Sequence, residues 1–350
     1  MKKLDFTFLG RLSILMISAF YVHSDSQPIQ IVELEPIKTF GGIDVPAEAI
    51  LNSPSDIAIS KEGEIIVSDA RENKLFVFDS DGRLIRTIGR EGTGPGELNG
   101  PRLIGVEDGV IKVFEARNNR FQYFTLKGEH LKMMPLGFSI GTGTLVLGYK
   151  DDFFYATQGF RTEDLINHFQ VSGQKLDPIG KIEGKPFEFY EMLQIQEALI
   201  KKEIPDACRN EVLLIVTAGG RLFAFFQALP LVRIYSVDGK LESTITLNMP
   251  EFEEVKTRCI QFNVDLKKKG MPGFMGLKFW RDGVLMENGD VILLLADPEK
   301  MNLFRFDKDG KLTKRYHGVK DDILMLASHG SFLWAYGRET QVFYQFKIGQ

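Results

Sequence analysis

The chain has 350 residues, with 43 basic against 47 acidic side chains and a formal net charge of −4. This balance excludes the strongly basic surface that binding to a nucleic-acid backbone requires, so we expect no nucleic-acid partner. The 28 phenylalanines and 34 glycines favour an all-β fold of many short strands joined by tight turns.

The first 24 residues have the pattern of a secretory signal peptide. Basic residues precede an apolar run from Leu12 to Val22, which is too short to span a bilayer. We therefore predict cleavage near Ser24, export to the periplasm or the extracellular space, and no transmembrane segment in the mature chain. An uncleaved membrane-proximal anchor and a buried N-terminal helix are the alternatives.

A pair of strands then recurs five times along the chain. Each copy is an alternating aromatic strand, a turn centred on one glycine and a second strand, and another strand pair precedes it. The turn glycines are Gly82, Gly128, Gly173, Gly239 and Gly310. The first intervals define a period of about 45 residues, and four strands in such a period are typical of a β-propeller blade.

The two ends of the chain complete the ring. The C-terminal segment from Asp322 supplies only three strands of a further blade, and the segment from Pro36 has the apolar pattern of an outer strand. We therefore predict one all-β domain over residues 25–350, a six-bladed β-propeller with four-stranded antiparallel blades. In this arrangement the N-terminal strand closes the last blade and removes the exposed sheet edges.

Two insertions lengthen the later periods, at about residues 185–211 and 250–276. Apolar residues at helical spacing predict a helix in the first. Both precede an innermost strand, one on each side of the fourth blade, so we expect them to be neighbours on one face. Cys208 and Cys259 would then form a disulfide, which thiol labelling before and after reduction tests. The insertions could form a lid over the channel or a purely structural cover.

Residues 67–106 carry a recognisable family pattern. Asp69 and Asn73 precede an alternating strand, which is followed by the turn motif F-D-x-D-G and a glycine-rich run that ends before Pro101. This stretch resembles the NHL-repeat propellers, and the whole chain is similar to exported bacterial six-bladed propellers. The second blade is a weaker match, because Glu115 replaces the aspartate. The resemblance implies that Asp69 and Asn73 bond loop backbone, with ligand contact as the alternative.

The glycine-rich run at residues 87–98 could cradle a phosphate or turn a corner. It lacks the lysine that follows the glycines of a P-loop, and its glycine spacing differs from that of a dinucleotide-binding loop. We interpret it as the corner that leads from the outer strand of one blade to the innermost strand of the next.

The candidate ligand site lies on the face built by the loops before each innermost strand and between the second and third strands. These loops carry several arginines, which suit carboxylate or phosphate groups, although any single one could be ordinary solvated charge. The candidate ligand-binding residues are Arg71, Arg102, Arg117, Asn118, Arg120, Arg281, Asp322 and Arg338.

Metal and catalytic chemistry are not predicted. Lactonases and hydrolases similar to paraoxonase hold calcium with oxygen ligands in the channel, whereas Arg102, Leu213 and Arg281 occupy starts of innermost strands here. The five histidines do not readily converge on a zinc ion, and we identify neither a nucleophile elbow nor an acid pair. We expect no cofactor and no bound metal.

The resulting prediction is an exported, monomeric, non-enzymatic scaffold that binds a protein, peptide or glycan on its loop-rich face. The alternative is a metal-dependent hydrolase or lyase of the lactonase type. A convergent set of channel carboxylates and amides would favour the enzyme, and a broad arginine-rich surface would favour the scaffold.

Overall fold

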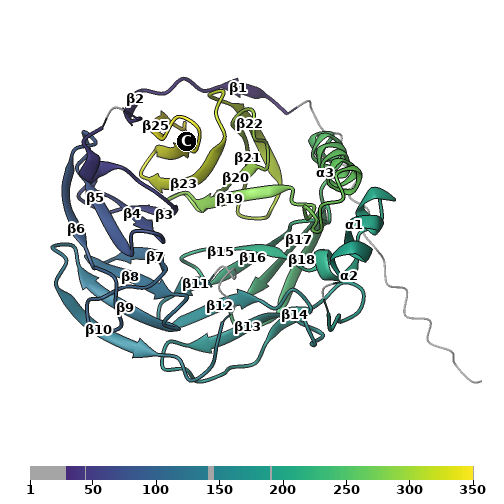
Figure 1. The fold of residues 1–350 in the computed structure, drawn as a ribbon, viewed down its shortest axis with the longest axis horizontal. Helices are drawn as coiled ribbons and strands as arrows, with labels where there is room; N and C mark the ends of the chain where they lie inside the picture. The colour runs from purple at the N-terminus through teal and green to yellow at the C-terminus, as the bar shows by residue number, and fades with distance from the viewer. Residues whose placement is uncertain (1–28, 44, 141–145, 190, 350) are drawn as a thin grey trace, which may run out of the picture.

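The strands form six sheets around a central axis in the computed structural model, which describes residues 29–43, 45–140, 146–189 and 191–349 (Figure 1). The six-bladed β-propeller predicted from the repeat is therefore confirmed. The proposed signal peptide lies outside the described residues. No helix among the described residues has the length and apolar character needed to cross a membrane.

Blades one to four follow the chain from the channel outward, each as four antiparallel strands. Blade one contains β3 (Pro54–Ile59), β4 (Ile65–Asp69), β5 (Lys74–Phe78) and β6 (Leu84–Ile88). Blade two contains β7 (Pro101–Glu107), β8 (Val110–Glu115), β9 (Arg120–Thr125) and β10 (His130–Pro135). Blade three contains β11 (Val146–Tyr149), β12 (Asp152–Ala156), β13 (Asp164–Gln170) and β14 (Ile179–Lys181). Blade four contains β15 (Val212–Val216), β16 (Arg221–Phe226), β17 (Leu231–Ser236) and β18 (Leu241–Thr246).

The N-terminal segment completes the last two blades. Blade five contains β19 (Trp280–Leu285), β20 (Val291–Leu295), β21 (Asn302–Phe306) and β22 (Leu312–His317), and blade six contains β23 (Ile323–His329), β24 (Phe332–Gly337) and β25 (Val342–Lys347). As predicted, β2 (Lys38–Gly41) is the fourth strand of blade six and pairs with β25. An unpredicted strand, β1 (Ile31–Glu33), adds a fifth strand to blade five and runs parallel to β22.

The core lies between successive blades. The middle strands β4 and β5 are almost wholly buried because a neighbouring blade covers each face. At the closure, the Phe40 ring stacks on Phe343 with ring centroids 4.7 Å apart, and it lies 6.1 Å from the Phe78 ring of blade one. Gly82 has a φ of +81°, and a Cβ there would lie 2.1 Å from the Phe40 ring. Glycine is therefore required at this turn for two reasons: the positive φ disfavours other residues, and the closing strand leaves no space for a side chain.

The two insertions form helices at the rim of the disc, next to blades four and five (Figure 1). They are α1 (Met192–Ile200), α2 (Asp206–Arg209) and α3 (Glu251–Lys268), and a 3-10 turn (Ala47–Ala49) precedes blade one. The insertions are neighbours, as predicted: the Gln196 side chain donates to the Gly273 carbonyl at 2.8 Å, and Lys267 pairs with Glu197 at 2.9 Å. Their position at the rim means that these helices are not a lid over the channel.

Cys208 and Cys259 lie in the same apolar cluster, which joins the helices to blades four and five. Both are buried free thiols in this structure. Burial raises the pKa of the Cys208 thiol to about 12 and that of Cys259 to about 11. Native thiols of this kind react slowly, because the thiolate is the reactive form. Their pairing in a disulfide stays a prediction.

Candidate functional site

The aspartate of the family pattern is a structural residue. Asp69 ends β4 and is fully buried. One carboxylate oxygen accepts hydrogen bonds from the backbone N–H groups of Asn52 and Ser53 at 2.7 and 2.9 Å, and the other accepts two from Arg71 and Glu72 at 3.0 Å. Four backbone donors thus occupy this carboxylate, which agrees with the role implied by the family resemblance.

In blade two, Glu115 replaces that aspartate and organises the preceding corner loop. Its carboxylate accepts from the Arg120 side chain at 2.5 Å and from the Asn118 amide at 2.6 Å. Arg120 in turn donates to the carbonyls of Gly94 and Glu97 at 3.1 and 2.8 Å. Arg120 is 5% exposed, so its guanidinium is committed to holding this loop in place.

The Glu97 side chain occupies the space inside the corner loop at residues 87–98. The Glu97 carboxylate accepts from the backbone N–H groups of Thr93 and Gly94 at 3.1 and 2.9 Å, and it also pairs with Arg90. A carboxylate of the chain thus takes the donors that a bound phosphate would need. The structure agrees with the corner-turning interpretation.

The sequence-predicted site residues therefore separate into two groups. Asn118 and Arg120 maintain the loop of blade two, while Arg71 and Arg117 are exposed on the loops between second and third strands. Arg117 also donates to the Asn99 side chain at 3.4 Å. Of the remaining four, Arg281 lines the channel cavity, Asp322 pairs with both Arg281 and Arg338, and Arg102 lies close enough to Asp56 to lower its pKa.

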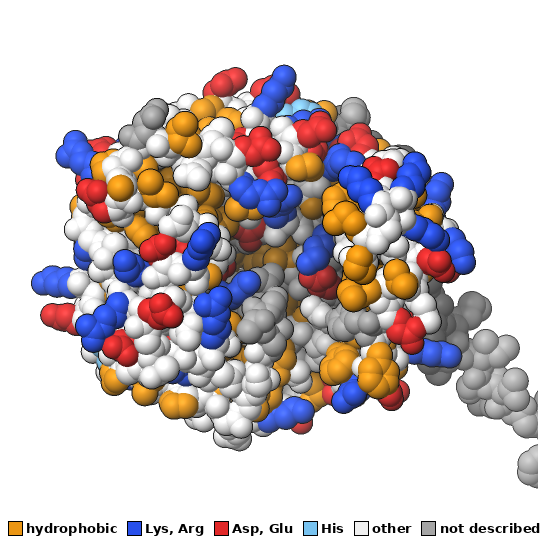
Figure 2. All heavy atoms as spheres, viewed as in Figure 1, with side chains coloured by type: hydrophobic (Ala, Val, Ile, Leu, Met, Phe, Trp, Pro, Cys, Tyr) orange, Lys and Arg blue, Asp and Glu red, His pale blue; other side chains and the backbone are white. Residues whose placement is uncertain are grey.

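The six innermost strands enclose a cavity of about 660 Å³ along the central channel. They are β3, β7, β11, β15, β19 and β23. Figure 2 shows one face of the disc, where basic and acidic side chains surround a central hollow. The wall of the cavity combines aliphatic side chains with polar ones. Its charged residues are Asp56, Glu107, Lys112, Lys150, Arg281 and Asp282.

Two aspartates occupy equivalent positions in this wall. The pairing of β3 with β4 has an irregularity between Pro54 and Asp56, and that of β19 with β20 has one between Trp280 and Asp282. Each aspartate is thus the first regularly paired residue after a β-bulge, a distortion that redirects a side chain. Asp56 belongs to blade one and Asp282 to blade five, with blade six between them.

Burial raises the pKa of Asp56 and of Asp282 to about 7. The Arg102 guanidinium lowers the pKa of Asp56, whereas the negative charge of Asp282 raises it further. Asp282 accepts from the backbone N–H groups of Gly283 at 2.8 Å and Leu326 at 2.7 Å, which favour its charged form. Near neutral pH the two groups can therefore supply both a hydrogen-bond donor and an acceptor.

Asp322 holds two arginines at the start of blade six. It is 1% exposed and forms ion pairs with Arg281 of blade five and with Arg338 on the loop after β24. Arg281 also lines the channel cavity, while the Arg338 side chain is 60% exposed. The arrangement presents two guanidinium groups from neighbouring blades on one shared carboxylate.

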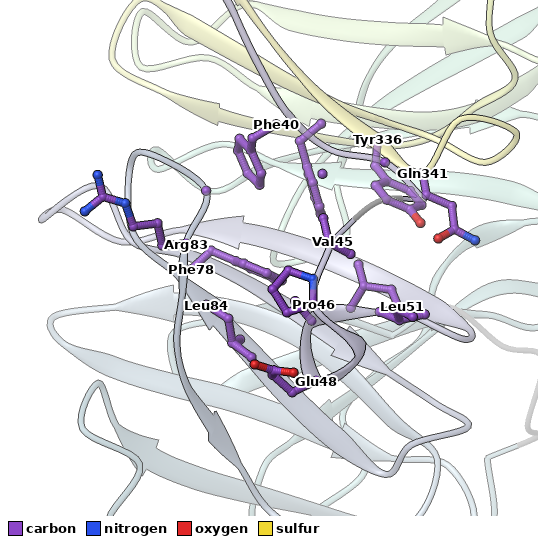
Figure 3. Close-up of a pocket in the computed structure, with 16 residues that line it drawn as sticks. Phe40, Val45, Pro46, Glu48, Leu51, Phe78, Arg83, Leu84, Tyr336 and Gln341 are labelled. Atoms are coloured by element: carbon purple, nitrogen blue, oxygen red, sulfur yellow. The ribbon is translucent and has the colours of Figure 1, made fainter.

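A second cavity, of about 330 Å³, lies at the seam between blades six and one (Figure 3). Its wall is mainly apolar and includes Phe40, Phe78, Leu84 and Tyr336. Phe40 comes from the closing strand, so this space is a property of the ring closure. No candidate site residue predicted from the sequence lines it.

Sequence reasoning did not recognise Asp56 and Asp282 as a pair. It placed Arg102 and Arg281 at the starts of innermost strands, whereas the bulges give Asp56 and Asp282 equivalent positions. The only sequence signal is an aspartate near the start of each strand. In the part of the chain that the structure describes, no group of three or more His, Cys, Asp or Glu side chains is arranged to hold a metal ion.

The comparisons with known proteins agree with the fold. Residues 45–199 match the DUF5128 family model, which is described as a 6-bladed beta-propeller. The matched residues run from before blade one to α1, so the chain is similar to this family over less than half of its length. No curated protein matched the sequence. The resemblance to NHL repeats stays a prediction.

Three solved structures illustrate the similarity of fold. A protein from Bacteroides fragilis described as exported has 12% identity and a TM-score of 0.54, covering 94% of this chain and 98% of its own. A duf4221 family member from Bacteroides vulgatus has 10% identity and a TM-score of 0.53, with coverages of 91% and 98%. PQQ-bound aldose sugar dehydrogenase from Streptomyces coelicolor has 16% identity and a TM-score of 0.51, with coverages of 90% and 98%. At such identities only the fold is shared.

Proposed function

We propose that the chain is an exported, non-enzymatic propeller scaffold that binds a peptide, a protein segment or a glycan at the mouth of its central channel. The observation that carries this proposal is the set of charged side chains on one cavity and its edge. Two guanidinium groups share Asp322, and two carboxyl groups with raised pKa values lie in the adjacent wall. Titratable side chains with shifted pKa values in a concave site support a ligand-binding role.

The chemistry of these groups suits a ligand that both donates and accepts hydrogen bonds. Asp56 and Asp282 both line the channel cavity. Their carboxyl groups can accept from a hydroxyl, an amide N–H or an amine of a ligand. Arg281 and Arg338 can donate to carbonyl, hydroxyl or carboxylate oxygens. Peptides and glycans offer both kinds of group.

Export is supported by the signal-peptide pattern at the N-terminus and by the similarity of fold to a protein described as exported. The alternative function, a metal-dependent hydrolase or lyase, requires a bound ion. Elemental analysis of the purified chain, with thermal unfolding in the presence and absence of a chelator, tests that alternative. A stoichiometric metal whose removal lowers the melting temperature would favour the enzyme.

The binding proposal is tested by probing a panel of peptides and oligosaccharides with the purified chain. We expect some members to bind the wild type and to lose at least tenfold in affinity with the Arg281→Ala, Arg338→Ala double variant. Arg83→Ala is the control, because it removes one exposed charge from the outer hairpin of blade one. Equal binding by the wild type and the double variant would place the ligand elsewhere. A panel without any binder would contradict the ligand class.

A further inference from the structure

The first insertion and its neighbours form an exposed apolar surface at the rim. Phe189 and Leu193 are 69% and 63% exposed, Met192 and Met271 about half, and Phe160 43%. We call these five residues the rim patch. Figure 2 shows apolar side chains among charged ones over the part of the disc that the helices occupy in Figure 1. Exposed apolar side chains that gather among charged ones are typical of interaction sites in soluble proteins.

Contacts hold the parts of the rim patch together. The Arg161 guanidinium lies 5.0 Å from the Phe160 ring centroid and 5.7 Å from that of Phe189. The backbone N–H of Arg161 donates to the Phe187 carbonyl at 2.9 Å, which joins the loop of blade three to the segment before α1. The bond from Gln196 to Gly273 brings the chain that follows α3 beside α1. The patch is thus preorganised by bonded neighbours, which reduces the entropy cost of binding.

Charge of both signs surrounds these apolar residues. Glu188 and Glu191 are exposed on the α1 side, where Arg161 also lies, and Lys268 and Lys269 are exposed on the α3 side. A two-fold axis between the two sides would place the two glutamates of one copy opposite the two lysines of the other.

We propose that the rim patch is the interface of a symmetric homodimer. The five apolar side chains expose roughly 500 Å² if each has about 200 Å² in full exposure. With the surrounding charged residues this approaches the roughly 800 Å² per partner of a standard interface. The sequence alone led to the expectation of a monomer. The proposal goes beyond the ligand binding at the channel and is independent of it.

Sedimentation velocity of the purified chain, from about 1 µM to about 100 µM, tests the proposal. The sedimentation coefficient of the wild type should rise with concentration. The Phe189→Glu, Leu193→Glu double variant should stay monomeric over the same range. Leu131→Glu is the control, because Leu131 is equally apolar and 51% exposed, but on the outer strand of blade two. A wild type that is monomeric throughout, or a double variant that dimerises as well as the wild type, would overturn the proposal.

A charge exchange keeps the test decisive if the double variant fails to fold. Lys268→Glu with Lys269→Glu should weaken dimerisation at least tenfold, because four acidic groups would then meet at each of the two symmetry-related contacts. Adding Glu188→Lys and Glu191→Lys to the same chain should restore it. Failure of this restoration would overturn the proposal. Binding of the monomer to anionic vesicles, lost in the Phe189→Glu, Leu193→Glu variant, would instead assign the patch to a lipid surface.

Discussion

Blades one and two use their polar residues differently from blades five and six. In the first pair, Asp69 and Glu115 are fully buried and bonded to loop groups of the chain itself. In the second pair, Asp282 lies in the channel wall, and Arg338 reaches solvent while paired with Asp322. The residues that make the family pattern visible are thus those that hold the blades together.

This difference shows that a recognisable repeat need not indicate the binding site. A repeated polar residue is most easily explained by a need that recurs in each blade, such as satisfying loop backbone. A ligand contacts the channel only once, so its residues need not recur. Arg281, Asp282, Asp322 and Arg338 of the proposed site lie outside the part of the chain that matches the family model, whereas Asp56 lies within it.

Ring closure supports both regions, and its loss should have the largest effect. Deleting residues 29–40 removes β1 and most of β2, and it exposes the edge of β25 and the Phe343 ring. We expect loss of the cooperative thermal transition, or a destabilisation of more than about 4 kcal/mol. Deleting residues 29–34 alone, which removes only β1, should cost clearly less. Unchanged thermal unfolding of the longer deletion would refute the closure.

The structural character of blade one is tested by Asp69→Ala. The substitution leaves four backbone N–H groups without their acceptor, so we expect the free energy of unfolding to fall by about 3 kcal/mol. Urea unfolding measures the change. Asp79→Ala provides the comparison, because that aspartate accepts only from turn residues in a more exposed hairpin. If both variants lost the same small amount of unfolding free energy, Asp69 would not have the structural role that separates blade one from the channel site.

The carboxyl groups in the channel should make the protein less stable as the pH rises, whereas a salt-bridged aspartate makes a protein less stable as the pH falls. Folding raises the pKa of Asp56 from 3.8 to about 7, so the folded chain retains a proton that the unfolded chain loses. The contribution of Asp56 to stability therefore falls as the pH rises from about 4 to 7. Asp56→Asn removes this loss. Its stability relative to the wild type should be about 1–2 kcal/mol greater at pH 8 than at pH 5 in urea unfolding. Parallel pH profiles would contradict the assignment.

The smallest effect on stability is expected at Arg338. Its side chain is 60% exposed, and Asp322 keeps its ion pair with Arg281 when Arg338 is replaced. Arg338→Ala should therefore change the free energy of unfolding by less than about 0.5 kcal/mol. Thermal unfolding checks this value. A loss of 2 kcal/mol or more would place Arg338 with the structural residues of blades one and two.

The architecture could be predicted from the sequence because every blade requires the same kinds of residue at the same spacing. The turn glycines and alternating aromatic strands identify the hairpins. The closure is identified by three strands of the last blade at the C-terminus and one strand at the N-terminus. The strand β1 was missed because three residues in a parallel pair leave no alternating pattern to detect. The helix α3 was also not predicted, although its insertion was.

The candidate site was predicted less well because residue type does not reveal where a side chain points. Arg120 and Arg281 both lie near channel-facing loops, yet the first is tied to a loop and the second lines the cavity. Asp56 and Asp282 became a pair only through two bulges, which shift the strand register without a distinct residue pattern.

The pairing of β2 with β25 also determines when the propeller can close. Lys38 pairs with Gln345, so a residue near the start of the described part of the chain can pair only after a residue near its end has been synthesised. A nascent chain therefore cannot complete its ring while the ribosome still holds the C-terminus, and long-range pairing of this kind slows folding. The contact between the two ends of the chain is therefore made only after synthesis is complete.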